Sequence, residues 1–164
     1  MTLAETLHTE IASPLGALTL TADGDALTSV RFEQHAHLAP LAADSRRDDR
    51  ARVFAEARRQ LAAYFAGELR EFTLPLAPRG SEFQRKVWAA LAEIPFGATS
   101  SYGALARRLG LPNHARAVGH ANARNPLSIF VPCHRVVGAS GALTGYAGGT
   151  ERKRWLLAHE GASG

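Results

Sequence analysis

Cys133 is the residue with the clearest capacity for chemistry, and it is the only cysteine among the 164 residues. It stands between Pro132 and His134, with Arg135 following. A cysteine reacts as its thiolate, so cationic or hydrogen-bonding neighbours must lower its ordinary pKa of about 8.5. Adjacent side chains of an extended segment point apart, so we expect His134 to act through a turn or a water molecule. The segment therefore offers a nucleophile and a candidate base.

The residue types alone leave a second interpretation open. A lone cysteine is more often a small buried core residue than a nucleophile. Glu160 reads equally well as a surface acid, and Asn125, which precedes Pro126, reads equally well as the end of a helix. A single cysteine also excludes an internal disulfide and a zinc site with several thiolates. We expect no metal and no cofactor, with His8, His35 and His37 at the surface.

The positive charge lies in the second half of the chain. Residues 1–79 carry nine Lys and Arg against eleven Asp and Glu, whereas residues 80–164 carry ten against four. A basic surface attracts a polyanion such as DNA by counterion release, although it is also compatible with an ordinary solvated face. The chain contains no run of about 18 apolar residues and no signal-peptide pattern, so we expect a cytoplasmic protein that does not enter a membrane.

The first half of the chain has the pattern of an antiparallel sheet with one helix. Short apolar segments separated by Gly and Pro turns predict strands over 6–11, 17–21 and 27–32. After a polar stretch over 34–49, apolar residues at helical spacing predict a helix over 53–65. Alternation at Phe72, Leu74 and Leu76 predicts one more strand. The sequence Pro78-Arg79-Gly80 then indicates a linker, so we expect domains at 1–79 and 80–164.

The second half has the pattern of a small helical domain. Ser81 and Gln84 form a capping-box pattern that predicts a helix reaching Ile94, and further helices are expected over 102–109 and 114–124. The tight turn between the last two suggests a helix-turn-helix, although such pairs are common in helical domains. Thr150 is expected to cap a final helix.

Four segments together decide between these interpretations. They are RAVGHANARNP over 116–126, VPCHRVV over 131–137, GYAGG over 145–149 and WLLAHEG over 155–161. In content and spacing they resemble the O6-alkylguanine-DNA alkyltransferase family. The resemblance is strongest over 81–161 and weaker over 13–16 and 64–68. It implies an α+β protein, with an N-terminal ribonuclease-H-like domain and a C-terminal winged-helix domain.

The resemblance implies a partner and a way of binding it. The partner is double-stranded DNA that contains O6-alkylguanine, bound through its minor groove by the helix over 114–124. Small residues would allow the helix to approach a groove about 6 Å wide, and Arg116 would fill the space left by a flipped nucleotide. The expected DNA-binding residues are Arg116, Arg124, Ala115, Ala117, Gly119 and Ala121.

The resemblance also assigns roles around the cysteine. Cys133 matches the alkyl acceptor, His134 the water-mediated base, and Glu160 the acid that orients the imidazole. Asn125 matches a residue that braces the turn before the active-site strand. The expected pocket residues are Tyr102, whose hydroxyl would bind guanine, Val136, whose carbonyl would accept from the exocyclic amine, and Tyr146, Ala147 and Gly148, which would form the wall beside the alkyl group.

The expected function is repair by irreversible transfer of an alkyl group from guanine O6, with thymine O4 as a further candidate, onto Cys133. Some relatives replace this cysteine and only bind lesions, so a non-catalytic lesion sensor or DNA-binding regulator is the alternative. A cysteine hydrolase, which would turn over repeatedly, is a third interpretation. We expect a monomer and leave open its cooperative assembly on DNA, as well as the range of alkyl groups that it accepts.

Overall fold

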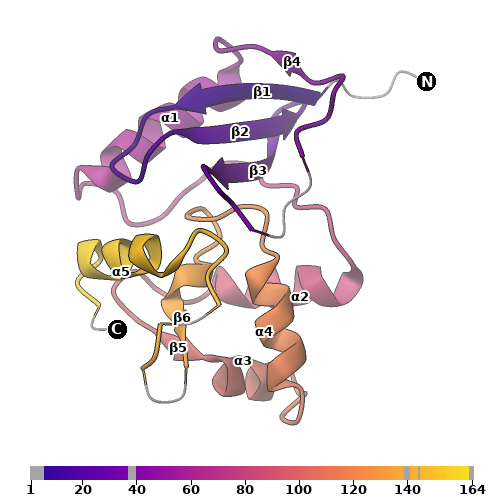
Figure 1. Ribbon diagram of the computed structural model, residues 1–164, viewed down its shortest axis with the longest axis vertical. Helices are drawn as coiled ribbons and strands as arrows, with labels where there is room; N and C mark the ends of the chain where they lie inside the picture. The colour runs from indigo at the N-terminus through magenta and orange to yellow at the C-terminus, as the bar shows by residue number, and fades with distance from the viewer. Residues whose placement is uncertain (1–5, 37–39, 139–140, 144, 163–164) are drawn as a thin grey trace.

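The computed structural model describes residues 6–36, 40–138, 141–143 and 145–162 (Figure 1). The first half forms a four-stranded sheet in the order β3-β2-β1-β4. Its three longer strands pair antiparallel, and β4 pairs parallel to β1. The strands are β1 (Thr6–Ile11), β2 (Leu18–Asp23), β3 (Ala26–Phe32) and β4 (Arg46–Arg47). The predicted meander over residues 6–32 is confirmed.

Helix α1 (Arg52–Phe65) covers one face of this sheet (Figure 1). Its buried side chains recur at the spacing of a helix face and join the sheet residues in one core. They are Val53, Phe54, Ala57, Gln60, Leu61 and Tyr64. The helix predicted over 53–65 is therefore confirmed, and it presents its last buried residue, Tyr64, toward the second half of the chain.

One expectation for the first half is wrong, and one short strand was not predicted. The strand predicted from Phe72 to Leu76 is absent, and only Leu76 forms an isolated bridge, with Leu27. Alternation at three positions is too short a pattern to distinguish a strand from an extended segment that rests on the core. Conversely, β4 lies in the polar stretch over 34–49, where two exposed arginines carry no apolar signal.

The second half consists of short helices. The helices are α2 (Glu82–Leu91), α3 (Tyr102–Arg108), α4 (Ala115–Ala123) and α5 (Thr150–His159). Both hydrogen bonds of the predicted capping box between Ser81 and Gln84 are present. Thr150 does not cap α5, because it is the first helical residue and Gly149, with φ of +90°, precedes it. No helix of the described residues is long and apolar enough to cross a membrane.

A two-stranded parallel sheet connects the helices to the cysteine segment. It pairs β5 (Ser100–Ser101) with β6 (Val136–Val137). Just before β6, the 3₁₀ helix η1 (Cys133–Arg135) carries the cysteine. The family resemblance implied a strand at the active site. The cysteine lies instead on a helical turn.

The two halves share an interface at β3 and α5. The amide of Val30 donates to the carbonyl of Pro126 at 2.8 Å, and Val30 forms a parallel bridge with Leu127. Helix α5 lies between the sheet half and the small β5-β6 sheet (Figure 1). Side chains of both halves contribute to one continuous apolar core. The segment before the cysteine is thus anchored to the sheet of the other half.

Candidate active site

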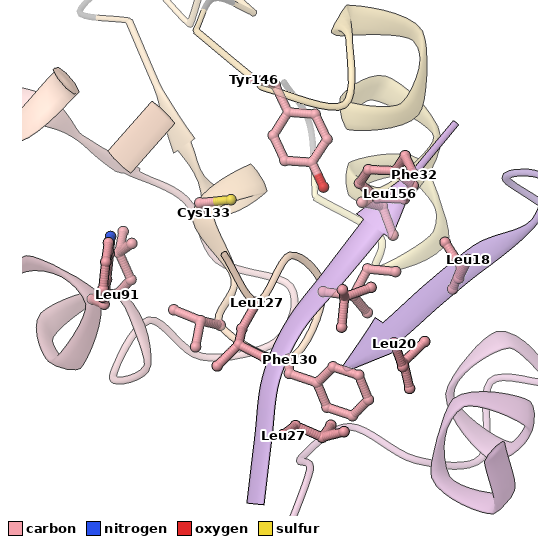
Figure 2. Close-up of a cluster of buried hydrophobic side chains, with 14 of the residues drawn as sticks. Leu18, Leu20, Leu27, Phe32, Leu91, Leu127, Phe130, Cys133, Tyr146 and Leu156 are labelled. Carbon is pink, nitrogen blue, oxygen red and sulfur yellow. The ribbon is translucent and has the colours of Figure 1, made fainter. Parts of the chain in front are cut away.

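Cys133 lies in the interior, where the helical turn η1 meets the core. Its side chain is only 3% exposed, and Figure 2 shows it between Tyr146 and Leu127. The sulfur is therefore not presented at the mouth of an open pocket. The 3₁₀ turn changes the relation of Cys133 to His134, because neighbours on a turn are no longer forced to opposite sides, as they are on a strand.

His134 and Glu160 form a buried hydrogen-bonded pair. Nε2 of His134 lies 2.8 Å from Oε2 of Glu160, and neither side chain is exposed. An ionised carboxylate only accepts, so Nε2 carries the proton and the second ring nitrogen, Nδ1, holds the lone pair. Nδ1 is buried and makes no hydrogen bond with the described residues. The imidazole is thus oriented by an acid and keeps one nitrogen available as a base.

Glu160 receives further hydrogen bonds from two more side chains. Arg135 donates from Nε to Oε1 at 2.8 Å and from Nη2 to Oε2 at 3.0 Å. The Tyr64 hydroxyl donates to Oε2 at 2.6 Å. Burial alone would raise the pKa of Glu160, but the hydrogen bonds from His134, Arg135 and Tyr64 lower it to about 2. The carboxylate therefore stays charged over the whole working pH range.

Burial lowers the pKa of His134, although Glu160 opposes that effect. The imidazole is consequently neutral near pH 7 and is able to accept a proton. Burial also raises the pKa of Cys133, and the lowering effects of Asn125, Lys153 and Ser128 only partly oppose it. The expectation of a lowered thiol pKa is therefore not met. Cys133 is thus a thiol at neutral pH, and the next residue in the chain, His134, is a neutral base.

Asn125 holds the chain just before the cysteine. Its Nδ2 donates to the carbonyl of Val131 at 2.8 Å, and its Oδ1 accepts from the amide of Leu127 at 3.0 Å. Between these residues, Ile129 adopts a φ of +77°, which costs a β-branched residue of order 1–3 kcal/mol and persists only where the surroundings impose it. Asn125 thus braces a strained turn that sets the position of η1.

Lys153 is a site residue that the sequence pattern did not reveal. It is fully buried, and its Nζ donates to the carbonyl of Val136 at 2.5 Å. Burial lowers the pKa of Lys153 to about 8, and the neighbouring Cys133 opposes this effect. The available signal was its spacing, because Lys153 falls on the same helix face as Leu156 and Glu160. The carbonyl oxygen of Val136 accepts this hydrogen bond with one lone pair, and its second lone pair is available to a ligand.

Tyr102, Tyr146 and their loop come together from distant parts of the chain. A Cβ placed on Gly145 would lie 2.9 Å from the hydroxyl oxygen of Tyr102, so the half-buried Tyr102 touches this loop. Tyr146 is 8% exposed and packs against Phe32. Gly148 lies between these two rings, since a Cβ there would come within 2.8 Å of both. Ala147, beside it, accepts a hydrogen bond from Ala36 at its carbonyl.

The exposed side of α4 faces away from the core. Arg116 and Arg124 are exposed, whereas Ala115, Ala117 and Gly119 are partly buried. Beside them is a surface depression of about 410 Å³, lined by Tyr102, Ala115, Arg116, Gly119, His120, Ala123, Arg124 and Gly145. Ala121 is an exception among the expected DNA contacts. It is 2% exposed and its carbonyl accepts from Trp88, so it packs α4 against α2 instead of facing outward.

Two family models cover almost the whole chain. Residues 82–162 match the DNA binding domain of 6-O-methylguanine DNA methyltransferase, and residues 6–78 match its ribonuclease-like domain. A methylated-DNA–protein-cysteine methyltransferase of Mycolicibacterium paratuberculosis is 53% identical over 150 residues, which span 92% of this chain and 89% of that protein. The chain belongs to the 6-O-methylguanine DNA methyltransferase family. The α+β architecture expected from the sequence is therefore confirmed.

Other members of the 6-O-methylguanine DNA methyltransferase family agree with this assignment. A methylated-DNA–protein-cysteine methyltransferase of Methanosarcina acetivorans is 50% identical over 92% of this chain and 95% of its own length. The crystal structure of Mycobacterium tuberculosis OGT in complex with DNA matches this fold with a TM-score of 0.88. The match covers 94% of this chain and 92% of that one, at 49% sequence identity.

Proposed function

We propose that this chain repairs alkylated DNA by moving an alkyl group from O6 of guanine to Sγ of Cys133. The observation that carries this assignment is the buried pair of His134, the next residue after Cys133 in the chain, and Glu160, joined at 2.8 Å. Family membership supplies the reaction, and this geometry supplies the nucleophile, the base and the orienting acid that such a reaction needs. The two matched domains support a division near residues 79 and 80.

The proton of the thiol passes to Nδ1 of His134. Because Glu160 holds the proton on Nε2, Nδ1 is the only basic nitrogen of the ring. The structure gives no direct hydrogen bond from Cys133 to this ring among the described residues, which supports transfer through a water molecule. The imidazolium that forms is stabilised by the Glu160 carboxylate, while Lys153 places a positive charge near the new thiolate.

The thiolate then attacks the alkyl carbon in line with the bond to O6. A carbon–sulfur bond forms as the carbon–oxygen bond breaks, and the electron pair of the broken bond goes to the guanine. A donor at O6 makes guanine a better leaving group. The Tyr102 hydroxyl, at the loop beside Gly145, is our candidate for this donor. The thioether is stable, so each molecule acts once.

Helix α4 is the proposed contact with the minor groove of double-stranded DNA. Ala115, Ala117 and Gly119 lack bulk, which supports a close approach of the helix to a narrow groove. Arg116 is exposed on the same helix and would stack into the gap left by a flipped nucleotide. The thiol is 3% exposed and Tyr146 lies near it. Entry of the base would therefore require covering side chains such as Tyr146 to move.

The stoichiometry of transfer tests this proposal. The protein is incubated with an excess of duplex carrying labelled O6-methylguanine, and the methyl groups bound to protein are counted against time. We expect a plateau at one methyl group per molecule for the natural chain. We expect no transfer for Cys133→Ala, with nearly unchanged affinity for the duplex, because the side chain is buried away from the DNA-binding surface.

Other results would favour the competing functions. Binding of the duplex without any transfer would identify a lesion sensor. Repeated release of methyl groups as methanol would identify a hydrolase. Full transfer by the Cys133→Ala variant would exclude this cysteine as the acceptor.

A further inference from the structure

Tyr64 connects the N-terminal half directly to the catalytic pair. Its hydroxyl donates to Oε2 of Glu160 at 2.6 Å, across a sequence separation of 96 residues. The side chain is fully buried. A buried hydroxyl needs a partner, and this one is bonded to the carboxylate oxygen that also accepts from His134.

The ring of Tyr64 is fixed by packing on several sides. It meets Phe65, Phe72, Phe96 and His159 with ring centroids 5.0–6.2 Å apart. Nε2 of His159 also lies 2.7 Å from the Tyr64 carbonyl. The hydroxyl is thus held in one position by aromatic contacts that belong to both halves of the molecule.

We propose that Tyr64 is a positioning residue of the transfer reaction, which fixes the Glu160 carboxylate and sets the basicity of His134 through it. The inference rests on the proposed function. It extends that function by giving the N-terminal half a part in the chemistry, through one hydroxyl group.

The physical argument concerns a shared oxygen. Oε2 of Glu160 accepts from Tyr64 at 2.6 Å and from Nε2 of His134 at 2.8 Å. Each donor withdraws electron density from the oxygen, so the phenol weakens the interaction of that oxygen with the imidazolium. Without the phenol, Oε2 binds the imidazolium more strongly and the imidazole becomes easier to protonate. The carboxylate also becomes freer to rotate away from the ring.

Other charged and titratable groups face the same pair and remain in place in the test. Arg135 of η1 bonds both carboxylate oxygens. Lys153 of α5 acts on His134 and Cys133, and His159 of α5 contacts the Tyr64 ring. None of these groups is changed when Tyr64 loses only its hydroxyl. A shift in the pH profile of Tyr64→Phe therefore reports on the hydroxyl itself.

The test is the pH dependence of single-turnover methyl transfer from a saturating O6-methylguanine duplex. For Tyr64→Phe we expect the acid limb of the rate profile to move up by about half a pH unit. We also expect the plateau rate to fall about five-fold, as for loss of one hydrogen bond in the transition state. Thr73→Val is the matched control, since it removes a hydroxyl that bonds Gln60 of the same helix at 3.1 Å without contacting Glu160.

The inference is overturned if the acid limb of the pH–rate profile is the same for Tyr64→Phe and the natural chain. This holds for any change in the plateau rate. A shift of equal size in Thr73→Val overturns it as well. If Tyr64→Phe folds poorly, NMR of the natural protein decides. We expect a slowly exchanging Tyr64 hydroxyl proton with a nuclear Overhauser effect to the Nε2 proton of His134, and its absence from the folded protein would overturn the inference. Failure of the natural chain to transfer at all would instead refute the proposed function.

Discussion

At the scale of single residues, the centre of the site is the buried Glu160 carboxylate, whose oxygens accept hydrogen bonds from protein side chains. Four donors surround the Glu160 carboxylate: Tyr64 Oη, His134 Nε2, Arg135 Nε and Arg135 Nη2. Removing a charge from water costs several kcal/mol, and only excellent hydrogen-bond geometry offsets that cost. This geometry keeps the acid ionised and the neighbouring imidazole neutral, which is the state that general-base catalysis requires.

We predict that stability falls with acid in two steps. The pKa of His134 is lowered in the folded protein, so below about pH 6.5 the unfolded chain takes up a proton more readily than the folded one. The free energy of unfolding therefore decreases as the pH falls below that value. The pKa of Glu160 is lowered from 4.5 to about 2, so its contribution is lost as the pH falls through that range. Urea unfolding at a series of pH values measures both steps. His134→Gln should flatten the first step, and an unchanged slope in that variant would contradict the assignment.

We predict that replacing Lys153 raises stability and lowers activity. Its pKa of about 8, against 10.5 in water, corresponds to a cost of about 3 kcal/mol for burying the charge. Lys153→Met removes this cost but leaves the Val136 carbonyl without its donor, which costs about 1 kcal/mol. We expect the free energy of unfolding to rise by about 1–2 kcal/mol and transfer to slow at least ten-fold, since the charge no longer favours the thiolate. A destabilised variant with natural transfer rates would contradict this prediction.

The candidate site residues predicted from the sequence are those whose neighbours in the chain carried a signal. Cys133 and His134 are adjacent, and Glu160 belonged to a segment that resembled a known family. Tyr64 and Lys153 were missed as site residues because their roles depend on contacts 96 and 17 residues away. Tyr64 falls on the apolar face of its predicted helix, and only the fold shows which polar atom Tyr64 and Lys153 each meet.

At the scale of elements, α4 carries the prediction about DNA. Arg116→Ala should slow transfer from duplex DNA by at least ten-fold and leave transfer from the free O6-methylguanine base nearly unchanged, because the free base needs no flipping. Rates on the two substrates, measured side by side, give the ratio. Arg50→Ala is the control, since Arg50 is exposed in the segment between β4 and α1, and Figure 1 shows β4 at the opposite end of the molecule from α4. Equal slowing of both substrates by Arg116→Ala would contradict the role in flipping.

Elements with strong local signals were predicted well. The capping box at Ser81 marked the start of α2, and glycine turns marked the ends of the strands over 6–32. The failures have local reasons. Thr150 was not the cap because Gly149 ends the preceding loop in a left-handed conformation. The 3₁₀ turn at Cys133 follows from hydrogen bonds of Asn125 that no pattern in the sequence displays.

At the scale of the whole molecule, Arg152 joins the active-site loop to the sheet half. Its guanidinium donates to the carbonyls of Leu15, Glu33 and Gly148 at 3.0–3.1 Å. It also lies over the ring of Phe32, 4.9 Å from the centroid. Phe32 in turn packs against Tyr146, so one side chain connects β3 with the wall of the pocket. The sequence indicated two domains but gave no sign of this connection.

We predict that Arg152→Met loosens this loop. The variant should lose about 2 kcal/mol of unfolding free energy, as expected when hydrogen bonds from a charged group are removed. Hydrogen exchange should rise at Gly148 and Gly149 but not at the far end of the sheet. Arg154→Met is the control, because Arg154 is also an arginine of α5 but is exposed. Equal effects of the two variants would show that Arg152 has no special role.

The position of the transferred methyl group tests the central claim most directly. The natural protein is incubated with an O6-methylguanine duplex, digested, and its peptides are sequenced by tandem mass spectrometry. We predict a single methyl group on the sulfur of Cys133 in every modified molecule. A methyl group on any other side chain, or no methylated peptide from protein that has bound the duplex, would contradict it.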